Sequence, residues 1–257
     1  MMERFRDPAP PILIGLVFLI FWEVAVRLFD VPPYVLPGPL LILETLWIDT
    51  GLLMGSLWIT LKITLAALLA AALGGAGLAF VMSRAPWLER SLLPYAIIAQ
   101  VTPIVAIAPL IIIWIDNDFA ALVVCAWIVA FFPVLANTMA GLKSADRHLH
   151  DLFRLYGASR MQTQTLLEAP TALPYFLAGL RISGGLALIG AVVAEFVAGS
   201  GGAATGLAYR ILEAGYRLQI PRLFAALVLL SLAGIAIYAL LSWFSKWAQR
   251  RCYGGED

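Results

Sequence analysis

The chain has 257 residues, of which 62% are hydrophobic and only 13% are charged, and its mean hydropathy is +0.91. Soluble domains carry about 25% charged residues, so a water-soluble core cannot hold this much apolar surface and lipid must solvate part of it. The formal net charge of +1, with no basic stripe of interleaved aromatics, gives no reason to expect a nucleic-acid partner. Cys125 and Cys252 have neither metal-ligand spacing nor the context of a disulfide.

The N-terminal apolar stretch resembles a signal peptide in its first residues. However, it is long, it carries Glu23 and Arg27, and it lacks a small-residue cleavage site. We therefore expect a retained first helix, in which Glu23 and Arg27 form an i,i+4 pair.

About 20 apolar residues cross a bilayer as a helix, and only helices or closed barrels satisfy the backbone in lipid. On this basis the sequence predicts an all-α membrane protein with six transmembrane helices in a single transmembrane domain over residues 1–257. The predicted spans are 10–29, 58–82, 91–115, 119–141, 175–197 and 223–245. Pro94, Pro103 and Pro109 predict that the third span is kinked or broken.

The distribution of Lys and Arg predicts that both termini are cytoplasmic. Inner segments then hold Arg4, Arg6, Arg84, Arg90, Lys143, Arg147, Arg154, Arg160, Lys246, Arg250 and Arg251. Outer segments hold only Arg210, Arg217 and Arg222, all in the third outer loop, whereas the loops over about 30–57 and 116–118 have none.

The long inner loop, about 142–174, is polar enough to leave the membrane and patterned enough to fold. Its apolar residues recur at helical spacing, at Leu149, Leu152, Phe153 and Tyr156. Gly157 suits the left-handed conformation that ends a helix, and Ser159 with Gln162 forms a capping-box pattern for a second short helix. Pro170 and Pro174 are expected to limit how that helix continues. Such a loop either projects to bind a partner or lies on the membrane surface as an amphipathic connector.

The same loop resembles the cytoplasmic E-A-A motif of binding-protein-dependent ABC importer permeases. Aligned on Gly157, the motif's hydrophobic position falls on Leu167 and its terminal proline on Pro170, while Asp151-Leu152-Phe153 replaces the E-A-A triplet and Ala169 replaces the usual leucine. The VLPGP segment (35–39) and the TPIVAIAPLIIIW segment (102–114) are similar to the nitrate, sulfonate, taurine and pyrimidine-precursor branch.

The resemblance implies a type I ABC importer permease whose loop between helices 4 and 5 docks a separate cytoplasmic ATPase. Gly157, Ala158, Ser159 and Arg160 would then centre a coupling helix, supported by Asp151 and Leu167. The chain itself would be no enzyme and would bind no cofactor, because the ATPase subunits bind ATP. The other implied partners are a second permease copy, most simply in a homodimer, a periplasmic or lipid-anchored substrate-binding protein, and the lipid of the bacterial inner membrane.

The third outer loop, about 198–222, begins glycine-rich and continues as a possible amphipathic helix with Leu207, Ile211 and Leu218 near one face. It is either a gate or docking surface for a substrate-binding protein or a plain re-entrant hairpin. No Gly-Lys-Ser/Thr follows Gly199-Ser200-Gly201-Gly202, which excludes a phosphate-binding loop.

Four polar residues in the predicted spans are candidates for the translocation path. Glu195 is the acid of the fifth span, and a buried acid there lines a path or pairs with a neighbour. Gln100, Thr102 and Asn137 either face the path or form hydrogen bonds between helices, and we favour the hydrogen bonds.

Two other classes of protein remain as alternatives. An ion-coupled secondary transporter favours paired intramembrane acids and inverted repeats, and a membrane enzyme needs clustered His, Asp or Glu at one depth. The sequence shows neither feature convincingly, and His148 and His150 lie two apart, on different helix faces, which disfavours a shared metal.

Overall fold

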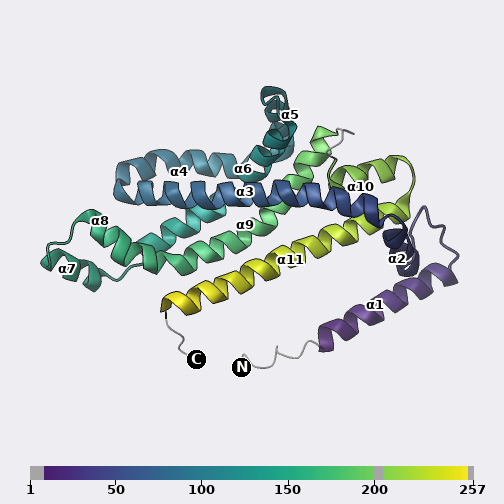
Figure 1. The fold of residues 1–257 in the computed structure, drawn as a ribbon, viewed down its shortest axis with the longest axis horizontal. Helices are drawn as coiled ribbons and strands as arrows, with labels where there is room; N and C mark the ends of the chain where they lie inside the picture. The colour runs from purple at the N-terminus through teal and green to yellow at the C-terminus, as the bar shows by residue number, and fades with distance from the viewer. Residues whose placement is uncertain (1–8, 200–204, 254–257) are drawn as a thin grey trace.

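The computed structural model describes residues 9–199 and 205–253, which are almost entirely helical (Figure 1). The elements in chain order are α1 (Ala9–Leu28), α2 (Pro39–Ile48), α3 (Thr50–Arg84), α4 (Pro86–Val101), α5 (Ile104–Trp114), α6 (Asp118–Lys143), α7 (Arg147–Leu155), α8 (Arg160–Thr163), the π-helical segment η2 (Gln164–Glu168), α9 (Ala169–Ala198), α10 (Leu207–Tyr216) and α11 (Ile220–Tyr253). Most of the glycine-rich start of the predicted third outer loop therefore lies outside the described residues.

Five described helices are long and apolar enough to cross a membrane: α1, α3, α6, α9 together with its α8–η2 extension, and α11. A sixth span results if α4 and α5 are counted together, because they form one apolar stretch bent by 101°. The break falls at Thr102–Pro103, where a proline lacks the backbone N–H of a continuous helix. The prediction of a broken third span is therefore confirmed.

Two segments differ from the sequence prediction. The sequence predicts an outer loop over about 30–57, but this range contains α2 and the first turns of α3. A ten-residue helix such as α2 is too short to be identified by a criterion of spanning length. The second short helix, whose continuation Pro170 and Pro174 were expected to limit, runs on through the π-helical turn η2 into α9, from Arg160 to Ala198. Pro170 lies in the first turn of α9, just where the hydrogen bonds change from the π to the α pattern, and helices tolerate proline in a first turn.

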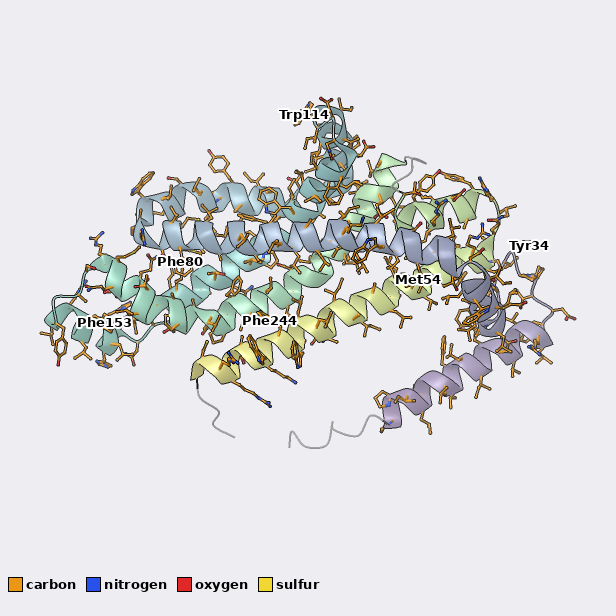
Figure 2. The ribbon with its side chains drawn as sticks, viewed as in Figure 1. Tyr34, Met54, Phe80, Trp114, Phe153 and Phe244 are labelled. Carbon is orange, nitrogen blue, oxygen red and sulfur yellow. The ribbon has the colours of Figure 1, made fainter. Side chains whose placement is uncertain are left out.

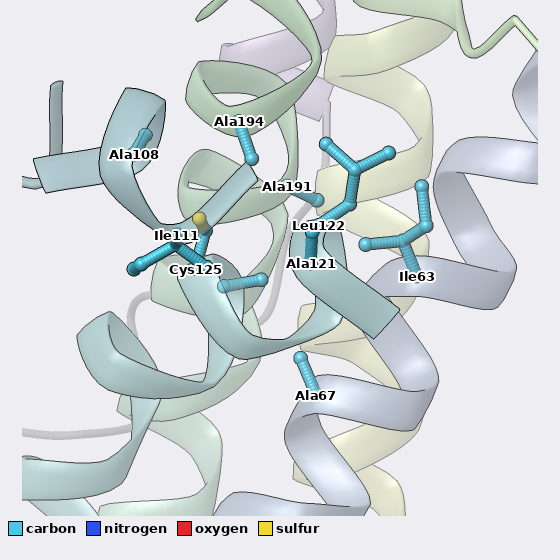
Figure 3. Close-up of a cluster of buried hydrophobic side chains, with 10 residues drawn as sticks. Ile63, Ala67, Ala108, Ile111, Ala121, Leu122, Cys125, Ala191 and Ala194 are labelled. Atoms are coloured by element: carbon cyan, nitrogen blue, oxygen red, sulfur yellow. The ribbon is translucent and has the colours of Figure 1, made fainter. Parts of the chain in front are cut away.

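The core lies where α3, α5, α6 and α9 meet (Figure 3). Most of its buried side chains are small, with Ala67 of α3, Ala126 of α6 and Ala191 of α9 among them. Small residues allow helices in a membrane to approach closely. At Gly190 of α9, an added Cβ would meet the backbone of Ala126 at 2.8 Å, so the packing of α6 on α9 requires glycine there.

The side chains at the periphery are mostly apolar (Figure 2). Trp114, at the end of α5, is 74% exposed, and α1 has no buried residue in its apolar window. Such surface is stable only against lipid or another protein. The fold therefore defines a multi-pass membrane protein, with α7 and α8 at one end of its long helices and α10 at the other (Figure 1).

Candidate functional site

The turn between α7 and α8 is built by local capping. α7 begins at Asp146, whose side chain accepts a hydrogen bond from His148 N at 2.8 Å. It ends at Leu155, and Gly157, just after the C-cap residue Tyr156, has a φ of +66°. Gly157 N donates to Arg154 O at 3.0 Å and Ala158 N to Phe153 O at 2.9 Å. This is the paired pattern of a Schellman motif, in which glycine takes the left-handed position without a Cβ clash.

A capping box begins α8 immediately after this turn. Ser159 Oγ accepts from Gln162 N at 3.2 Å, and Gln162 Oε1 accepts from Ser159 N at 2.7 Å. The helix stop at Gly157 and the capping box at Ser159 thus form as the sequence predicted. Both follow from residues within a few positions of one another, which is why the pattern alone identifies them.

A shallow, open pocket of about 410 Å³ lies in the angle between α7 and α8, and its lining comprises Leu152, Phe153, Tyr156, Gly157, Ala158, Gln162 and Leu166. Tyr156 is 83% exposed and Leu166 is 66% exposed. A concentration of apolar side chains on a segment that projects from the end of the helices is typical of a protein contact surface. We call the segment Arg147–Glu168 the projecting segment.

The structure brings most of the predicted coupling residues together on this segment. Ala158 and Ser159 lie in the turn and Arg160 is the first residue of α8, so with Gly157 they join two helices rather than centre one. Asp151 is exposed on α7. The remaining two predicted residues differ in burial: Leu167 is buried against the bundle and Pro170 is exposed at the start of α9.

Gln164, which the sequence analysis did not single out, holds the projecting segment to the bundle. Its side chain is buried in η2, and Nε2 donates to Phe80 O at 2.8 Å and to Ser83 Oγ at 2.7 Å. Arg84 Nε donates to Gln164 Oε1. The partners all lie near the end of α3, about 80 residues away, and no local pattern could have shown them.

The residues predicted for the translocation path do not converge on one polar site. Gln100 is exposed on α4. Thr102 Oγ1 donates to Ile98 O at 2.7 Å and Asn137 Nδ2 to Pro133 O at 2.8 Å. The favoured hydrogen bonds between helices are therefore wrong for Thr102 and Asn137, because a side chain bonded to the carbonyl four residues earlier is satisfied within its own helix.

Glu195 lies at the opposite end from the projecting segment and is buried. Its carboxylate accepts from Thr60 Oγ1 at 2.8 Å and from Ala208 N at 2.9 Å. Thr60 Oγ1 in turn accepts from Leu207 N at 2.8 Å. Glu195 and Thr60 thus each satisfy one backbone N–H group at the N-terminus of α10, where the helix dipole favours a negative charge.

The predicted amphipathic helix in the third outer loop is present as α10. Leu207 and Ile211 are buried as predicted, but Leu218 lies beyond the helix end, exposed and with a φ of +55°. Within and just after α10, Arg210 Nη1 donates to Glu213 at 2.7 Å, and Arg217 lies 3.0 Å from the same carboxylate. The hydrogen bond from Arg210 lowers the pKa of Glu213 below its usual value.

Among the described residues, no group of three or more His, Cys, Asp or Glu side chains could hold a metal ion. His150 Nε2 instead lies 3.7 Å from Glu168, which brings α7 against η2. What distinguishes the site is thus a capped, apolar, projecting pair of helices, not a set of reactive side chains.

The family described as "Binding-protein-dependent transport system inner membrane component" matches residues 63–252. The chain is 36% identical to the riboflavin transport system permease protein RibX of Chloroflexus aurantiacus, over 93% of this chain and 89% of that protein. It is 33% identical to the formylaminopyrimidine transport permease protein ThiX of Halalkalibacterium halodurans, over 93% of this chain and 94% of that protein.

A solved structure shows the same fold. It is described as a crystal structure of an amino acid ABC transporter with histidines, and one of its chains matches with a TM-score of 0.62. The match covers 79% of this chain and 97% of that chain at 19% identity, so it shows a similarity of fold alone.

Fold and projecting segment together define a helical membrane permease. The chain belongs to the family of inner-membrane components of binding-protein-dependent transport systems, as a permease of the ABC importer kind. This membership does not support the ion-coupled secondary transporter that the sequence left as an alternative.

Proposed function

We propose that this permease forms the translocation path of an ATP-driven importer and docks a separate cytoplasmic ABC ATPase through its projecting segment. One observation carries the proposal: the described structure stabilises a pair of capped helices that present an apolar pocket, with Tyr156 and Leu166 exposed, beyond the ends of the membrane-spanning helices. A connector lying on the membrane would need neither the Schellman motif nor the pocket. Arg160, exposed beside the pocket, adds a charge for partner recognition.

In this proposal both termini and the projecting segment are cytoplasmic, and α10 faces the substrate-binding protein. Two copies of the chain share one central path, with Gln100 of α4 as the candidate path residue that remains exposed. The other path candidates, Thr102, Asn137 and Glu195, have a structural role in this proposal, because the side chain of each is hydrogen-bonded within the protein. ATP is bound by the partner ATPase and not by this chain.

For the substrate we propose a small heteroaromatic solute. RibX and ThiX carry names that refer to riboflavin and formylaminopyrimidine, both heteroaromatic compounds, and each matches over most of its length. Uptake of radiolabelled riboflavin and of taurine by cells that express the permease, its ATPase and its binding protein tests this class. Uptake of taurine alone would reassign the substrate to the sulfonates.

The docking proposal is tested by co-expression with the ABC ATPase. Tyr156→Asp combined with Arg160→Glu changes two exposed side chains, so the fold should persist while the contact is lost. We expect co-purification of the ATPase to fall by about 10-fold or more, since a residue at the centre of an interface contributes about 2 kcal/mol.

Arg90→Glu, an exposed charge reversal on α4 outside the projecting segment, is the matched control and should co-purify normally. Normal co-purification of the double variant would refute docking at this segment. If the unaltered chain binds no ABC ATPase at all, the proposed function itself is wrong.

A further inference from the structure

The projecting segment and the opposite end of the molecule belong to one continuous helix. α8, η2 and α9 span 39 residues, from Arg160 to Ala198, which at 1.5 Å per residue is roughly 58 Å. α3, with 35 residues, is about 52 Å long and lies alongside (Figure 1). Both lengths exceed the hydrocarbon thickness of about 30 Å, so each helix reaches past both faces of a bilayer.

Gln164 joins these two helices at the end that carries the projecting segment. It is only 3% exposed, both of its bonds as a donor go to α3, and its carbonyl oxygen accepts from α3 as well. A buried amide with its donors and acceptor satisfied by one neighbouring helix fixes the position and rotation of its own segment. It also lies in a π-helical turn, a rare geometry that is frequent at functional sites.

Glu195 joins the same two helices at the other end. Its carboxylate accepts hydrogen bonds from the hydroxyl of Thr60 on α3 and from the backbone N–H of Ala208 on α10. The same Thr60 hydroxyl accepts from the backbone N–H of Leu207, so all three helices are joined at this point. The continuous helix is therefore hydrogen-bonded to α3 at both ends, and α10 is attached to the pair. A helix held at one end can pivot, whereas a helix held at two points can move only with its neighbour.

We propose that Gln164 is the positioning residue that makes the projecting segment and α3 one rigid body, so that a displacement of α7 and α8 reaches α10 at the opposite face. The proposal rests on the proposed function, in which the ATPase supplies that displacement. Gln164 acts through the helices it holds and touches neither substrate nor ATP.

Gln164→Met is the decisive variant, because it keeps the length and approximate volume of the side chain but removes its hydrogen bonds. Ser83 Oγ keeps its bond to Phe80 O, and Arg84 is exposed enough to bind water, so the fold should survive. Gln249→Met on α11, outside this network, is the matched control.

The first measurement is a spin-label distance distribution in lipid nanodiscs without any partner. One label replaces Thr165, exposed on η2, and the other replaces Leu69, exposed on α3, in a Cys252→Ser background in which the remaining Cys125 is buried. We expect a single narrow distribution for the unaltered chain and for Gln249→Met, and a broadened or divided one for Gln164→Met. Identical distributions in all three would overturn the proposal.

The second measurement uses the complex with the co-expressed ABC ATPase, nucleotide-free and trapped with ATP and vanadate. We expect the distance between Thr165 and Leu69 to stay the same in both states of the unaltered complex. Gln164→Met should retain the ATPase but lose coupling, so that stimulation of ATP hydrolysis by the binding protein falls by roughly 5-fold or more. Normal stimulation, or a Thr165–Leu69 distance that changes on trapping in the unaltered complex, would refute the rigid body. A failure to bind any ATPase would instead refute the proposed function, and the first measurement would still decide the role of Gln164.

Discussion

Two acidic residues in the long helices cap the short helix that follows each of them. Glu23 of α1 accepts a hydrogen bond from Leu40 N in the first turn of α2, at 3.1 Å, and also pairs with Arg27 as the sequence predicted. Glu195 of α9 accepts from Ala208 N, the corresponding position of α10. In both cases the residue before the helix, Gly38 or Gly206, lacks the Cβ that would collide with the carboxylate. The acids therefore serve to satisfy helix N-termini that the apolar surroundings would leave unpaired.

Gly206→Ala tests this arrangement at the residue scale. The added Cβ would overlap the Glu195 carboxylate, which must then leave Thr60 or Ala208. We expect a loss of about 2 kcal/mol, the usual range for overpacking a buried site, measured as the free energy of unfolding in an SDS titration.

Gly185→Ala is the control for that measurement, because its Cβ would meet nothing within 4 Å. It should leave stability unchanged or slightly higher, since alanine favours a helix interior. Equal stability of the two variants would contradict the role assigned to Gly206.

At the scale of elements, α11 is fastened to the junction of α2 and α3 by a two-point ion pair. Arg222 Nε lies 2.6 Å from Asp49 Oδ2, and Nη2 lies 3.1 Å from Oδ1. Both side chains are half-buried, and the neighbouring apolar contacts include Leu53 of α3 and Ala225 of α11. A bidentate pair in such surroundings fixes direction as well as distance, so it orients α11 against the end of α3.

A double-mutant cycle tests this element contact. Asp49→Asn should destabilise the protein by about 1 kcal/mol, because the partly buried pair loses its charge complement. Arg222→Gln should cost much less in the Asp49→Asn background than in the unaltered chain, as measured by unfolding in SDS. Strictly additive effects would show that the two residues do not interact. Asp116→Asn, an exposed acid at the other side of the bundle, serves as the control.

At the scale of the whole molecule, the side-chain hydrogen bonds that join α3 to its neighbours lie near its two ends. Gln164 and Arg84 lie at the end with the projecting segment, while Glu195, Arg210 and Arg222 lie near α10. Between them the helices pack through alanine and glycine and expose apolar side chains outward. This distribution fits a bilayer around the middle and water or protein partners at both ends.

The orientation in the membrane is testable with the native Cys252, which is exposed near the end of α11. A membrane-impermeant maleimide should label Cys252 in inverted vesicles and not in intact spheroplasts. Tyr216→Cys in a Cys252→Ser background should show the reverse, because Tyr216 is exposed at the end of α10. Labelling of Cys252 from outside would reverse the predicted topology.

The sequence was sufficient for features that depend on neighbours along the chain. Hydropathy indicated the spanning helices, the prolines indicated the break at Thr102–Pro103, and local spacing indicated the turn at Gly157 and the capping box at Ser159. Where local rules compete, the sequence alone was insufficient: it did not show that the helix before Pro170 continues through a π-helical turn, and it placed Leu218 near the face of a helix that ends before it.

The sequence by itself determined that this is a helical membrane protein with a capped pair of helices outside the bilayer, because hydropathy, capping and helix breaking act over a few residues. Only the tertiary structure decided that Gln164 binds the end of α3 and that Glu195 binds Thr60 and the start of α10. The end of α3 lies about 80 positions from Gln164, and Thr60 lies 135 positions from Glu195. A buried polar side chain must find a partner, but which one it finds depends on how distant helices pack.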